Sequence, residues 1–328
     1  MSATDSRIGL VWRPIEAADL PAIVDLLAAA GAVDHTEQHF NLDDVSHLYA
    51  NPQIDPGQDS LLAASPEGVA AASIVVSAGD AQGTFRASFL GTVRPGARGR
   101  GIGRELLDWS LARGTALHRE RAPQLPGAVD HAVFEGNDGW ESLCRAAGLT
   151  AVRWFVEMQR PLAGPTPKAP LPDGVRIEGY PQSYDDAVLA VRNEAFTTHW
   201  GSLQRSPEEW ARLTGSETFR RDLSLIAIHG DDVVGFLTAF VYPAATKASG
   251  IPETWVRSVG TSTNHRGRGI ASALLARAIE LHAAAGFERI GLEVDVDNTT
   301  GALRLYQRLG FIVARRVAAW ALELPALR

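Results

Sequence analysis

The sequence predicts an α/β protein made of two tandem domains, each a mixed β-sheet flanked by helices. Three observations lead to this prediction: the length, a motif that occurs twice, and strand-like stretches that alternate with helix-like ones. The chain has 328 residues, and at roughly 100–200 residues per domain this corresponds to about two domains. Apolar residues make up 45% of the chain and charged residues 21%, so each domain has enough apolar side chains for a core.

The repeated motif is a glycine-rich segment that follows a strand and precedes a helix. Arg98-Gly99-Arg100-Gly101-Ile102-Gly103 occurs again in the second half of the chain as Arg266-Gly267-Arg268-Gly269-Ile270-Ala271. A second match aligns Ala147-Gly148-Leu149 with Leu309-Gly310-Phe311. Because both matches keep the same order and nearly the same offset along the chain, they indicate a duplicated domain.

A proline-rich segment separates the two copies. Prolines occupy five positions between Pro161 and Pro172, a spacing typical of an extended, semi-rigid linker. We therefore expect an N-terminal domain over residues 1–163, a linker over residues 164–173 and a C-terminal domain over residues 174–328.

In the first half, alternating apolar residues predict strands, and apolar residues three and four apart predict helices. Ser65-Pro66-Glu67-Gly68 is typical of a turn between two strands, and residues 51–59 form a loop-rich stretch. The expected elements are a strand at 10–13, a helix at 20–30, a hairpin of 61–64 and 69–76, a strand at 85–93 and a helix at 105–116.

The second half shows the same order. The expected elements are a strand at 175–178, a helix at 187–196, strands at 224–229 and 233–242 joined by Gly230-Asp231-Asp232, a strand at 255–261 and a helix at 272–285. A strand at 290–296, a helix at 301–309 and a strand at 311–324 follow. Strands that alternate with helices indicate a mixed sheet in each half.

Charge and cysteine content narrow the class of function. Lys and Arg number 31 against 38 Asp and Glu, for a net charge of −7, which disfavours nucleic acid and favours cationic small molecules. The single cysteine, Cys144, excludes an intramolecular disulfide, and no Cys/His group has the spacing of zinc ligands, so we expect no metal. We find no signal segment and no run of about 18 apolar residues, and we expect a cytoplasmic protein with no membrane partner.

Each glycine-rich segment has the composition of an anion-binding loop. A strand that leads directly into a helix leaves the first backbone N–H groups unpaired at the positive end of the helix dipole. Small residues let a ligand approach that backbone, and Arg98 or Arg266 can add a bidentate positive charge. The alternative is a glycine-containing turn without a ligand, which the second copy disfavours. The sequence contains neither the dinucleotide fingerprint nor the Gly-Lys-Ser/Thr loop of nucleotide triphosphate sites.

These motifs resemble those of the GNAT superfamily of acyl-coenzyme A-dependent N-acyltransferases. The central family motif, Arg/Gln-x-x-Gly-x-Gly/Ala after a strand, is matched at residues 98–103 and 266–271. The downstream pattern of Asn, Ala and Leu-Tyr-x-x-x-Gly-Phe is matched by Asn298, Ala302 and residues 305–311. The resemblance covers both halves, with both motifs in the second half and only a partial match in the first, as in tandem members of the family.

The resemblance implies a splayed sheet in each domain and acetyl-coenzyme A as the acyl donor. It implies that the amides of Gly267 to Ala271 hold the pyrophosphate and that the strand around Val259 and Thr261 pairs with the pantetheine arm. The residues that it assigns to coenzyme binding are Val259, Thr261, Arg266, Gly267, Arg268, Gly269, Ile270, Ala271 and Asn298 in the second half, and Val93, Arg98, Gly99, Arg100, Gly101, Ile102 and Gly103 in the first.

Tyr306 is the expected catalytic acid, because the resemblance places it where the family often protonates the coenzyme A thiolate. The alternative is core packing, since Ala302, Leu305 and Leu309 share helical spacing with it. The first half has Cys144 at the corresponding position, four residues before Gly148, and a cysteine on a helix is usually a small buried hydrophobe. We therefore expect the first domain to be a non-catalytic copy, with or without bound coenzyme.

Glu293 is the expected base, with Asp295 behind it. An alkyl ammonium has a pKa near 10.4, so a positioned base helps to produce the neutral amine at neutral pH. On a strand, Glu293 and Asp295 share one face, opposite Leu292 and Val294. The alternative is that both carboxylates only occupy the polar face of the sheet.

His199 and Trp200 are the expected acceptor contacts, because the resemblance places their loop over the acceptor pocket. They offer a titratable group and an aromatic face for a cation, and the alternatives are a solvated histidine and a packing tryptophan. Glu194 and Glu208 are further candidates for cation contacts.

We therefore expect an N-acetyltransferase that moves an acetyl group from acetyl-coenzyme A to the primary amine of a small molecule. Direct attack in a ternary complex follows, because no motif places a histidine beside Cys144. Two alternatives stay open: a protein N-terminal or lysine acetyltransferase, and a non-catalytic acyl-coenzyme A sensor. We expect a monomer whose halves form an internal pseudo-dimer, or a weak homodimer.

Overall fold

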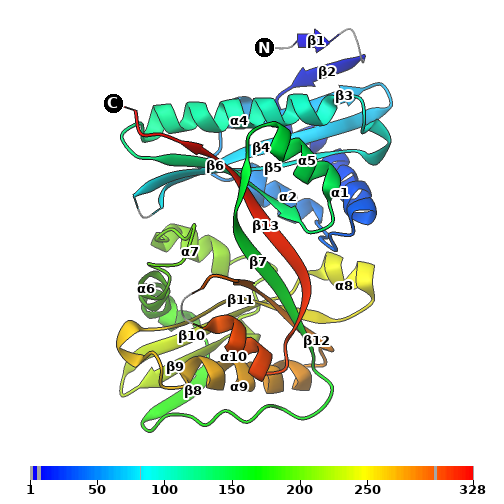
Figure 1. Ribbon diagram of the computed structural model, residues 1–328. Coiled ribbons are helices and arrows are strands. Elements are labelled where there is room, and N and C mark those ends of the chain that lie inside the picture. Colours follow the sequence, from blue (N-terminus) through cyan, green and yellow to red (C-terminus); the bar gives the residue numbers. More distant parts are fainter. Residues whose placement is uncertain (1–2, 6–8, 82, 299–300, 328) are drawn as a thin grey trace. The chain divides into compact units, whose positions relative to one another are not determined.

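The chain folds as two compact α/β units. The computed structural model describes residues 3–5, 9–81, 83–298 and 301–327. Unit 1 comprises Met1–Arg153 with Val317–Arg328, and unit 2 comprises Trp154–Arg316. Both units contain a mixed sheet with helices against it (Figure 1), which confirms the predicted fold class.

Unit 1 has its strands in the order β1-β2-β3-β4-β5-β6-β13. All neighbours are antiparallel except β5 and β6, which pair in parallel from Phe85 with Gly127 to Ser88 with Asp130. The strands are β1 (Ala3–Asp5), β2 (Leu10–Arg13), β3 (Ser60–Ser65), β4 (Gly68–Ala81), β5 (Thr84–Val93), β6 (Gly127–Phe134) and part of β13 (Ile312–Leu324). The helices are α1 (Leu20–Asp34), α2 (Leu42–Tyr49), α3 (Pro56–Asp59), α4 (Ile102–Arg121) and α5 (Asp138–Ala146).

Unit 2 has its strands in the order β7-β12-β11-β10-β9-β8. Here β11 and β12 form the parallel pair and the other neighbours are antiparallel. The strands are β7 (Thr150–Pro161), β8 (Val175–Gly179), β9 (Leu225–His229), β10 (Asp232–Phe240), β11 (Glu253–Thr261) and β12 (Arg289–Asp295). The helices are α6 (Asp185–Ala195), α7 (Pro207–Thr214), α8 (Pro243–Ser249), α9 (Ile270–Ala284) and α10 (Ala302–Arg308).

Apolar side chains cover both faces of the unit 2 sheet. On one face, Val256 and Leu292 pack with Leu274 of α9 and Tyr306 of α10. On the other face, a cluster around Phe240 packs against α6 and α7. We call this second face, which carries Arg257 and Glu293, the acceptor face. Because a mixed sheet covered on both sides needs apolar residues on both, β9 and β10 are almost continuously apolar.

The units divide the chain differently from the expected boundary at residue 163. β7 pairs with β12, from Phe155 with Asp295 to Pro161 with Arg289, and so belongs mainly to unit 2. The C-terminal part of β13 instead runs beside β6 (Figure 1), from Val317 with Phe134 to Leu324 with Gly127. Each half therefore supplies the last strand of the other half's sheet.

Most expected elements are present; α1, α4, α6 and α9 are longer than the pattern predicted, and α10 is shorter. α4 and α9 begin directly after Gly101 and Gly269, each with a φ of 87°, a conformation that glycine adopts without strain. The expected 51–59 loop contains α3, and the sequence analysis gave no range for β1, β6, β7, α2, α5, α7 or α8. In the described part of the chain, no helix is long and apolar enough to cross a membrane, and no group of His, Cys, Asp and Glu could hold a metal ion.

Removing Val317–Arg328 should destabilise unit 1, because the last strand of its sheet would be lost. Trp320 is 6% exposed and packs in the core that contains Phe89, and the loss of one large core side chain alone costs about 3–5 kcal/mol. We expect the thermal unfolding midpoint to fall by about 10 °C or more. A control that lacks only residues 325–328 should melt close to the full chain. An unchanged midpoint in the longer deletion would contradict the assignment of β13 to unit 1.

Candidate functional site

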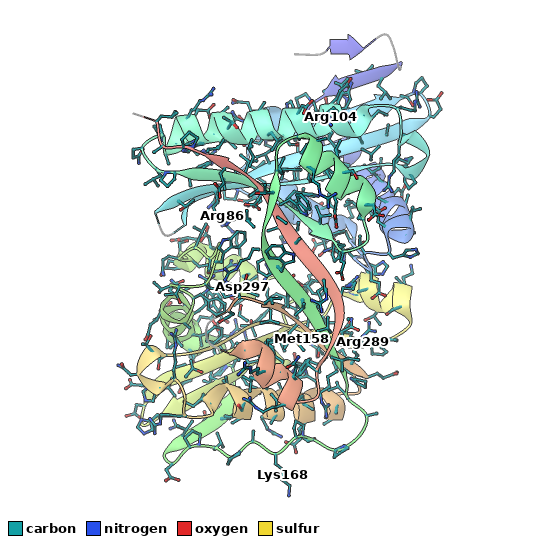
Figure 2. All side chains as sticks on the ribbon, in the orientation of Figure 1. Arg86, Arg104, Met158, Lys168, Arg289 and Asp297 are labelled. Atoms are coloured by element: carbon teal, nitrogen blue, oxygen red, sulfur yellow. The ribbon has the colours of Figure 1, made fainter. Side chains whose placement is uncertain are left out.

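The centre of unit 2 is a gap between two parallel strands. β11 and β12 pair from Glu253 with Arg289 to Val256 with Leu292, and no pairing is found beyond Leu292 although both strands continue. Arg289 begins β12 and Asp297 stands just past its end (Figure 2). Unpaired strand edges leave backbone N–H and C=O groups available to a ligand. The splayed sheet that the resemblance implies is therefore present.

A β-bulge marks the start of this gap. Val256 of β11 pairs with Ala239 of β10, and Ser258 pairs with Thr238, so Arg257 is an extra residue in β11. Bulges bend a strand and re-aim the side chain that they contain. Arg257 lies on the acceptor face, where its guanidinium is 5.6 Å from the centre of the Phe240 ring.

The glycine-rich loop of unit 2 presents open backbone at the start of α9. Gly267 and Gly269 have φ values of 74° and 87°, and no side chain caps the helix. A Cβ added to Gly267 would meet nothing within 4 Å, and one added to Gly269 would come only within 3.9 Å of the Pro170 carbonyl. The first amides of a helix lack intrahelical acceptors. This loop therefore fits an anion such as a pyrophosphate.

The motif arginines have a different partner from the one expected of them. The Arg266 guanidinium donates to the Ala195 carbonyl at the end of α6, with Nη2 to O at 3.0 Å. Arg98 forms a bidentate pair with Asp34 at the end of α1, at 2.7 and 2.8 Å. These side chains fasten each loop to the first helix of its unit, α6 or α1, so some of their donors are already occupied, whereas the backbone amides of the loop are open to an anion.

Glu293 lies on the acceptor face beside a second carboxylate that the sequence analysis did not identify. Glu157 of β7 is its partner in the register of β7 and β12, and Glu157 pairs with Arg315. The Glu293 side chain is exposed at the surface, but protein atoms surround most of its carboxyl group and remove part of its hydration. This loss of hydration and repulsion from Glu157 raise the pKa of Glu293 from its ordinary 4.5 to about 7, while Arg257 lowers it.

Asp295 and Asn298 shape the turn after β12. Asp295 is 2% exposed, and its Oδ1 accepts a hydrogen bond from the Asp297 amide at 3.0 Å. The Asn298 amide donates to the Asp295 carbonyl at 3.2 Å. Asp295 therefore holds a turn, whereas Glu293 is the carboxylate that the gap leaves accessible.

Tyr306 lies on the opposite side of the sheet from Glu293. It is 7% exposed, packs in the core with α9, and its ring centre is 6.0 Å from that of Phe311. Burial raises the pKa of Tyr306 to about 12. Cys144, its counterpart in unit 1, is fully buried in an apolar core, and burial raises its pKa to about 11.

The loop after α6 carries His199 and Trp200. The Trp200 ring centre is 5.8 Å from that of Phe155, the β7 partner of Asp295, and the His199 ring lies 5.3 Å from Phe196. This loop therefore reaches β7 at the open end of the gap.

The two glutamates considered as cation contacts have other surroundings. Glu194 accepts a hydrogen bond from the Thr263 amide at 2.6 Å, which lowers its pKa. Glu208 is an exposed residue in the first turn of α7.

Aromatic rings stand just beyond the last pair of β5 and β6 in unit 1, on the face that packs against α4 and α5 and not on the face that corresponds to Arg257 and Glu293. Phe89 precedes Arg257 by the offset that relates the two glycine-rich segments, and His131 precedes Glu293 by the offset that relates Gly148 to Gly310. The rings of Phe89 and His131 stack at 4.7 Å, the Trp140 ring is 4.5 Å from His131, and His131 Nδ1 hydrogen-bonds the Phe89 carbonyl at 2.9 Å. Burial lowers the pKa of His131 to about 4, so it is neutral at pH 7.

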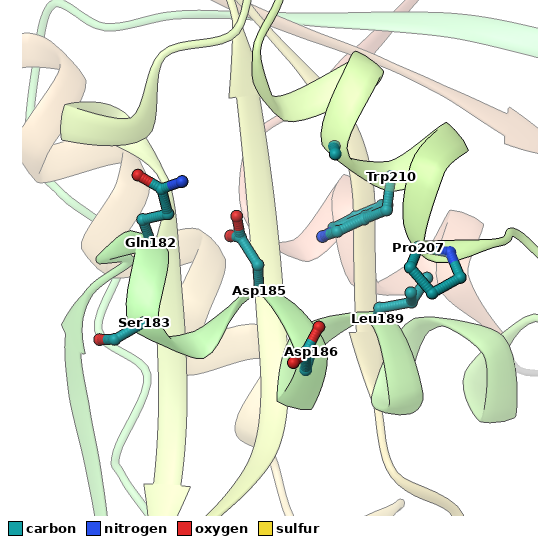
Figure 3. Close-up of a pocket in the computed structure, with 8 residues that line it drawn as sticks. Gln182, Ser183, Asp185, Asp186, Leu189, Pro207 and Trp210 are labelled. Atoms are coloured by element: carbon teal, nitrogen blue, oxygen red, sulfur yellow. The ribbon is translucent and has the colours of Figure 1, made fainter.

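A hollow of about 410 Å³ lies at the other end of α6, away from the gap (Figure 3). Asp185 in its wall pairs with Arg221, and the Trp210 indole donates to the Tyr180 hydroxyl at 3.1 Å. Since α6 spans about 16 Å from its first to its last residue, we do not include this hollow in the site.

Sequence reasoning missed Glu157 and Arg257. Glu157 lies far before Glu293 in the sequence and meets it only through strand pairing. Arg257 did leave a signal, because it is a lone charge inside the otherwise uncharged run of residues 254–263.

Comparison with known proteins shows that this chain is similar in sequence to acetyltransferases. Residues 186–311 match the family model described as Acetyltransferase (GNAT) family. A mycothiol acetyltransferase of Tsukamurella paurometabola is 34% identical over 237 residues, which cover 70% of this chain and 76% of that protein. Another, of Actinosynnema mirum, is 30% identical over 291 residues, which cover 88% and 91%.

Two solved structures share the whole fold. A GCN5-related N-acetyltransferase from Sphaerobacter thermophilus aligns with a TM-score of 0.76 and 27% identity over 97% of both chains. A tandem GNAT protein from the clavulanic acid biosynthesis pathway aligns with a TM-score of 0.69 and 20% identity over 96% and 98% of the two chains. The second likeness concerns the fold alone.

The raised pKa of Glu293 predicts a pH-dependent stability. Between pH 4.5 and about 7 the folded state binds more protons at Glu293 than the unfolded state, so this group makes the protein less stable as the pH rises through that window. Glu293→Gln removes the titration. We expect the variant to melt near the wild type at pH 5 and above it at pH 8, as measured by thermal unfolding. A difference in melting temperature that stays constant over this range would contradict the raised pKa.

Proposed function

Since the chain belongs to the GNAT acetyltransferase family and is an acyltransferase, we propose that unit 2 moves an acetyl group from acetyl-coenzyme A to the primary amine of a small molecule. The observation that carries this proposal is the gap between β11 and β12, which has the open glycine-rich loop at one end and Glu293 on the acceptor face. The mycothiol acetyltransferases among the relatives support a small-molecule acceptor.

The residues present fit the donor. The amides of Gly267 to Ala271 are the groups that would hold its pyrophosphate, and the free edge of β11 at Val259 and Thr261 would pair with its pantetheine arm. Arg268 and Ile270 take part in this loop through their backbone. When bound, acetyl-coenzyme A supplies an acetyl group that is activated as a thioester.

Glu293 is the proposed base. The acceptor arrives as an ammonium, and a carboxylate with a pKa of about 7 is half ionised near neutral pH, which suits it to accept that proton. Burial and, after it, the charge of Glu157 keep this pKa high, while the charge of Glu157 is balanced by Arg315. His199 and Trp200 are proposed to cover the bound amine.

Tyr306 is the proposed acid on the donor side. With a pKa of about 12 its hydroxyl keeps its proton at neutral pH and can donate to negative charge that develops on sulfur. Direct attack of the amine fits the chain, because its single cysteine, Cys144, is buried in a core.

Unit 1 is proposed to be non-catalytic. Phe89, His131 and Trp140 pack together in the core that contains Cys144, the residue at the position of Tyr306. The glycine loop at Gly99 and Gly101 is retained, but burial raises the pKa of the Cys144 thiol to about 11, and the carboxylate of Asp130 at the end of the paired stretch is bound by Arg86.

A pair of matched variants tests the function. Gly269→Val places a β-branched side chain at a φ of 87° in the loop of unit 2, and Gly101→Val makes the same change in unit 1. We expect Gly269→Val to lower the release of free thiol from acetyl-coenzyme A, in the presence of a panel of primary amines, by about 100-fold or more. Gly101→Val should retain most of the activity. Loss of activity in Gly101→Val alone would place catalysis in the other unit.

Tyr306→Phe removes one hydroxyl from a buried ring of the same shape. A general acid contributes about 10²–10⁴-fold to the rate, so we expect kcat to fall by about 100-fold. The dissociation constant for acetyl-coenzyme A, measured by calorimetry, should change less than threefold, or by about 0.6 kcal/mol. Unchanged turnover would show that Tyr306 serves only to pack the core.

A further inference from the structure

Three arginines gather on the acceptor face of unit 2. Arg192 belongs to α6, Arg205 follows in the loop before α7, and Arg257 is the bulged residue of β11. Asn193 holds the Arg205 backbone in place: its Oδ1 accepts from the Arg205 amide at 2.9 Å and its Nδ2 donates to the Arg205 carbonyl at 3.0 Å. The three positive charges are therefore fixed near one another by a helix, a strand and a clamped loop.

These charges are not balanced by an equal number of carboxylates. Burial, followed by the charges of Arg205 and Arg257, lowers the pKa of Arg192 to about 10, and burial and Arg257 lower the pKa of Arg205. Glu209 is the carboxylate that acts in the opposite direction on Arg192 and Arg205. In a chain with a net charge of −7, a local excess of positive charge indicates a place for an anion.

Two of the three guanidinium groups have donors to spare. Arg192 is committed to the protein through Asn193, Ser202 and the Leu203 carbonyl. By contrast, within the described ranges no residue accepts a hydrogen bond from the Arg205 guanidinium. Arg257 makes one long contact, 3.5 Å from Nη1 to the Tyr242 hydroxyl. A guanidinium carries five N–H donors in a planar fork that matches a carboxylate or a phosphate.

Arg257 lies beside the proposed base, and this position indicates which ligand the arginines would bind. Arg257 and Glu293 are the first residues of their strands beyond the last pair, Val256 with Leu292, and they interact electrostatically. Because both residues directly follow the last pair, an ammonium at Glu293 and an anion at Arg257 would face each other where the gap opens.

From this arrangement we propose that the acceptor is an anionic amine, whose carboxylate or phosphate is bound by Arg205 and Arg257 while its ammonium faces Glu293. Arg192 is a positioning residue, since its donors hold the loop that carries Arg205. This inference rests on the proposed function and narrows its substrate class from primary amines in general to zwitterions.

The test compares each anionic amine with its neutral counterpart. Glycine is paired with glycinamide, β-alanine with β-alaninamide, and phosphoethanolamine with ethanolamine, so that the panel also separates carboxylate from phosphate. Thiol release is measured with the full chain at saturating acetyl-coenzyme A. We expect kcat/KM to be about 10- to 100-fold higher for the anionic member of at least one pair, as charge-assisted hydrogen bonds provide.

Variants then test which residues cause the preference for anionic amines. Arg205→Gln and Arg257→Gln should each reduce that ratio by about tenfold, mainly through KM. Arg212→Gln, which removes an equal charge from the exposed surface of α7, should keep the wild-type ratio. Calorimetry with acetyl-coenzyme A should give the same affinity for all three variants, which shows that each one is folded.

The outcomes separate the two proposals. Neutral amines that react as well as anionic ones, or a ratio that the variants at 205 and 257 leave unchanged, would overturn the anion site while the acetyltransferase function stands. Binding of acetyl-coenzyme A without turnover of any amine would overturn the proposed function and the anion site with it.

Discussion

The separation of β11 from β12 is the constraint on which the rest of unit 2 depends. Four residue pairs join the two strands, and beyond Val256 and Leu292 the ladder stops. The bulge at Arg257 lies where pairing ends, and a bulge adds twist and bend to the strand that contains it. The strands diverge inside a sheet that is covered on both faces, with α9 and Tyr306 on one face and Glu293 on the other. In the proposed function, the donor and the acceptor meet at this gap from opposite faces.

Unit 1 has the same strand arrangement as unit 2, but different side chains where the pairing ends. β5 and β6 also pair over only four positions, ending at Ser88 and Asp130. There β5 has no extra residue opposite β4, whose own irregularity lies between Ser77 and Gly79. Aromatic side chains stack just beyond the paired residues, on the face of α4 and α5, and a ring nitrogen of His131 hydrogen-bonds the Phe89 carbonyl. Duplication therefore preserved the loop and the sheet, while the side chains beyond the paired residues differ between the two copies.

The sequence alone predicts structural features that depend on neighbouring residues, but not those that depend on contacts between distant parts of the chain. The two glycine-rich loops and their helices were predictable, since a strand, a turn with positive φ and a helix are local features. The exchange of β7 and β13 was not, because both are apolar strands that follow Gly148 and Gly310 in the same way. The pairing of Glu157 with Glu293 depends on that exchange, and so does the part of the raised pKa of Glu293 that comes from Glu157 and adds to the larger effect of burial.

The most direct measurement of the central claim is amide hydrogen exchange of the full chain with and without saturating acetyl-coenzyme A. If the gap in unit 2 binds the pantetheine arm, exchange slows at residues 257–261 together with 267–271, and residues 89–93 of unit 1 stay unchanged. Slower exchange confined to regions outside the gap, or slowing at 89–93 with none at 257–261, would show that the separation of β11 and β12 is not where the donor binds.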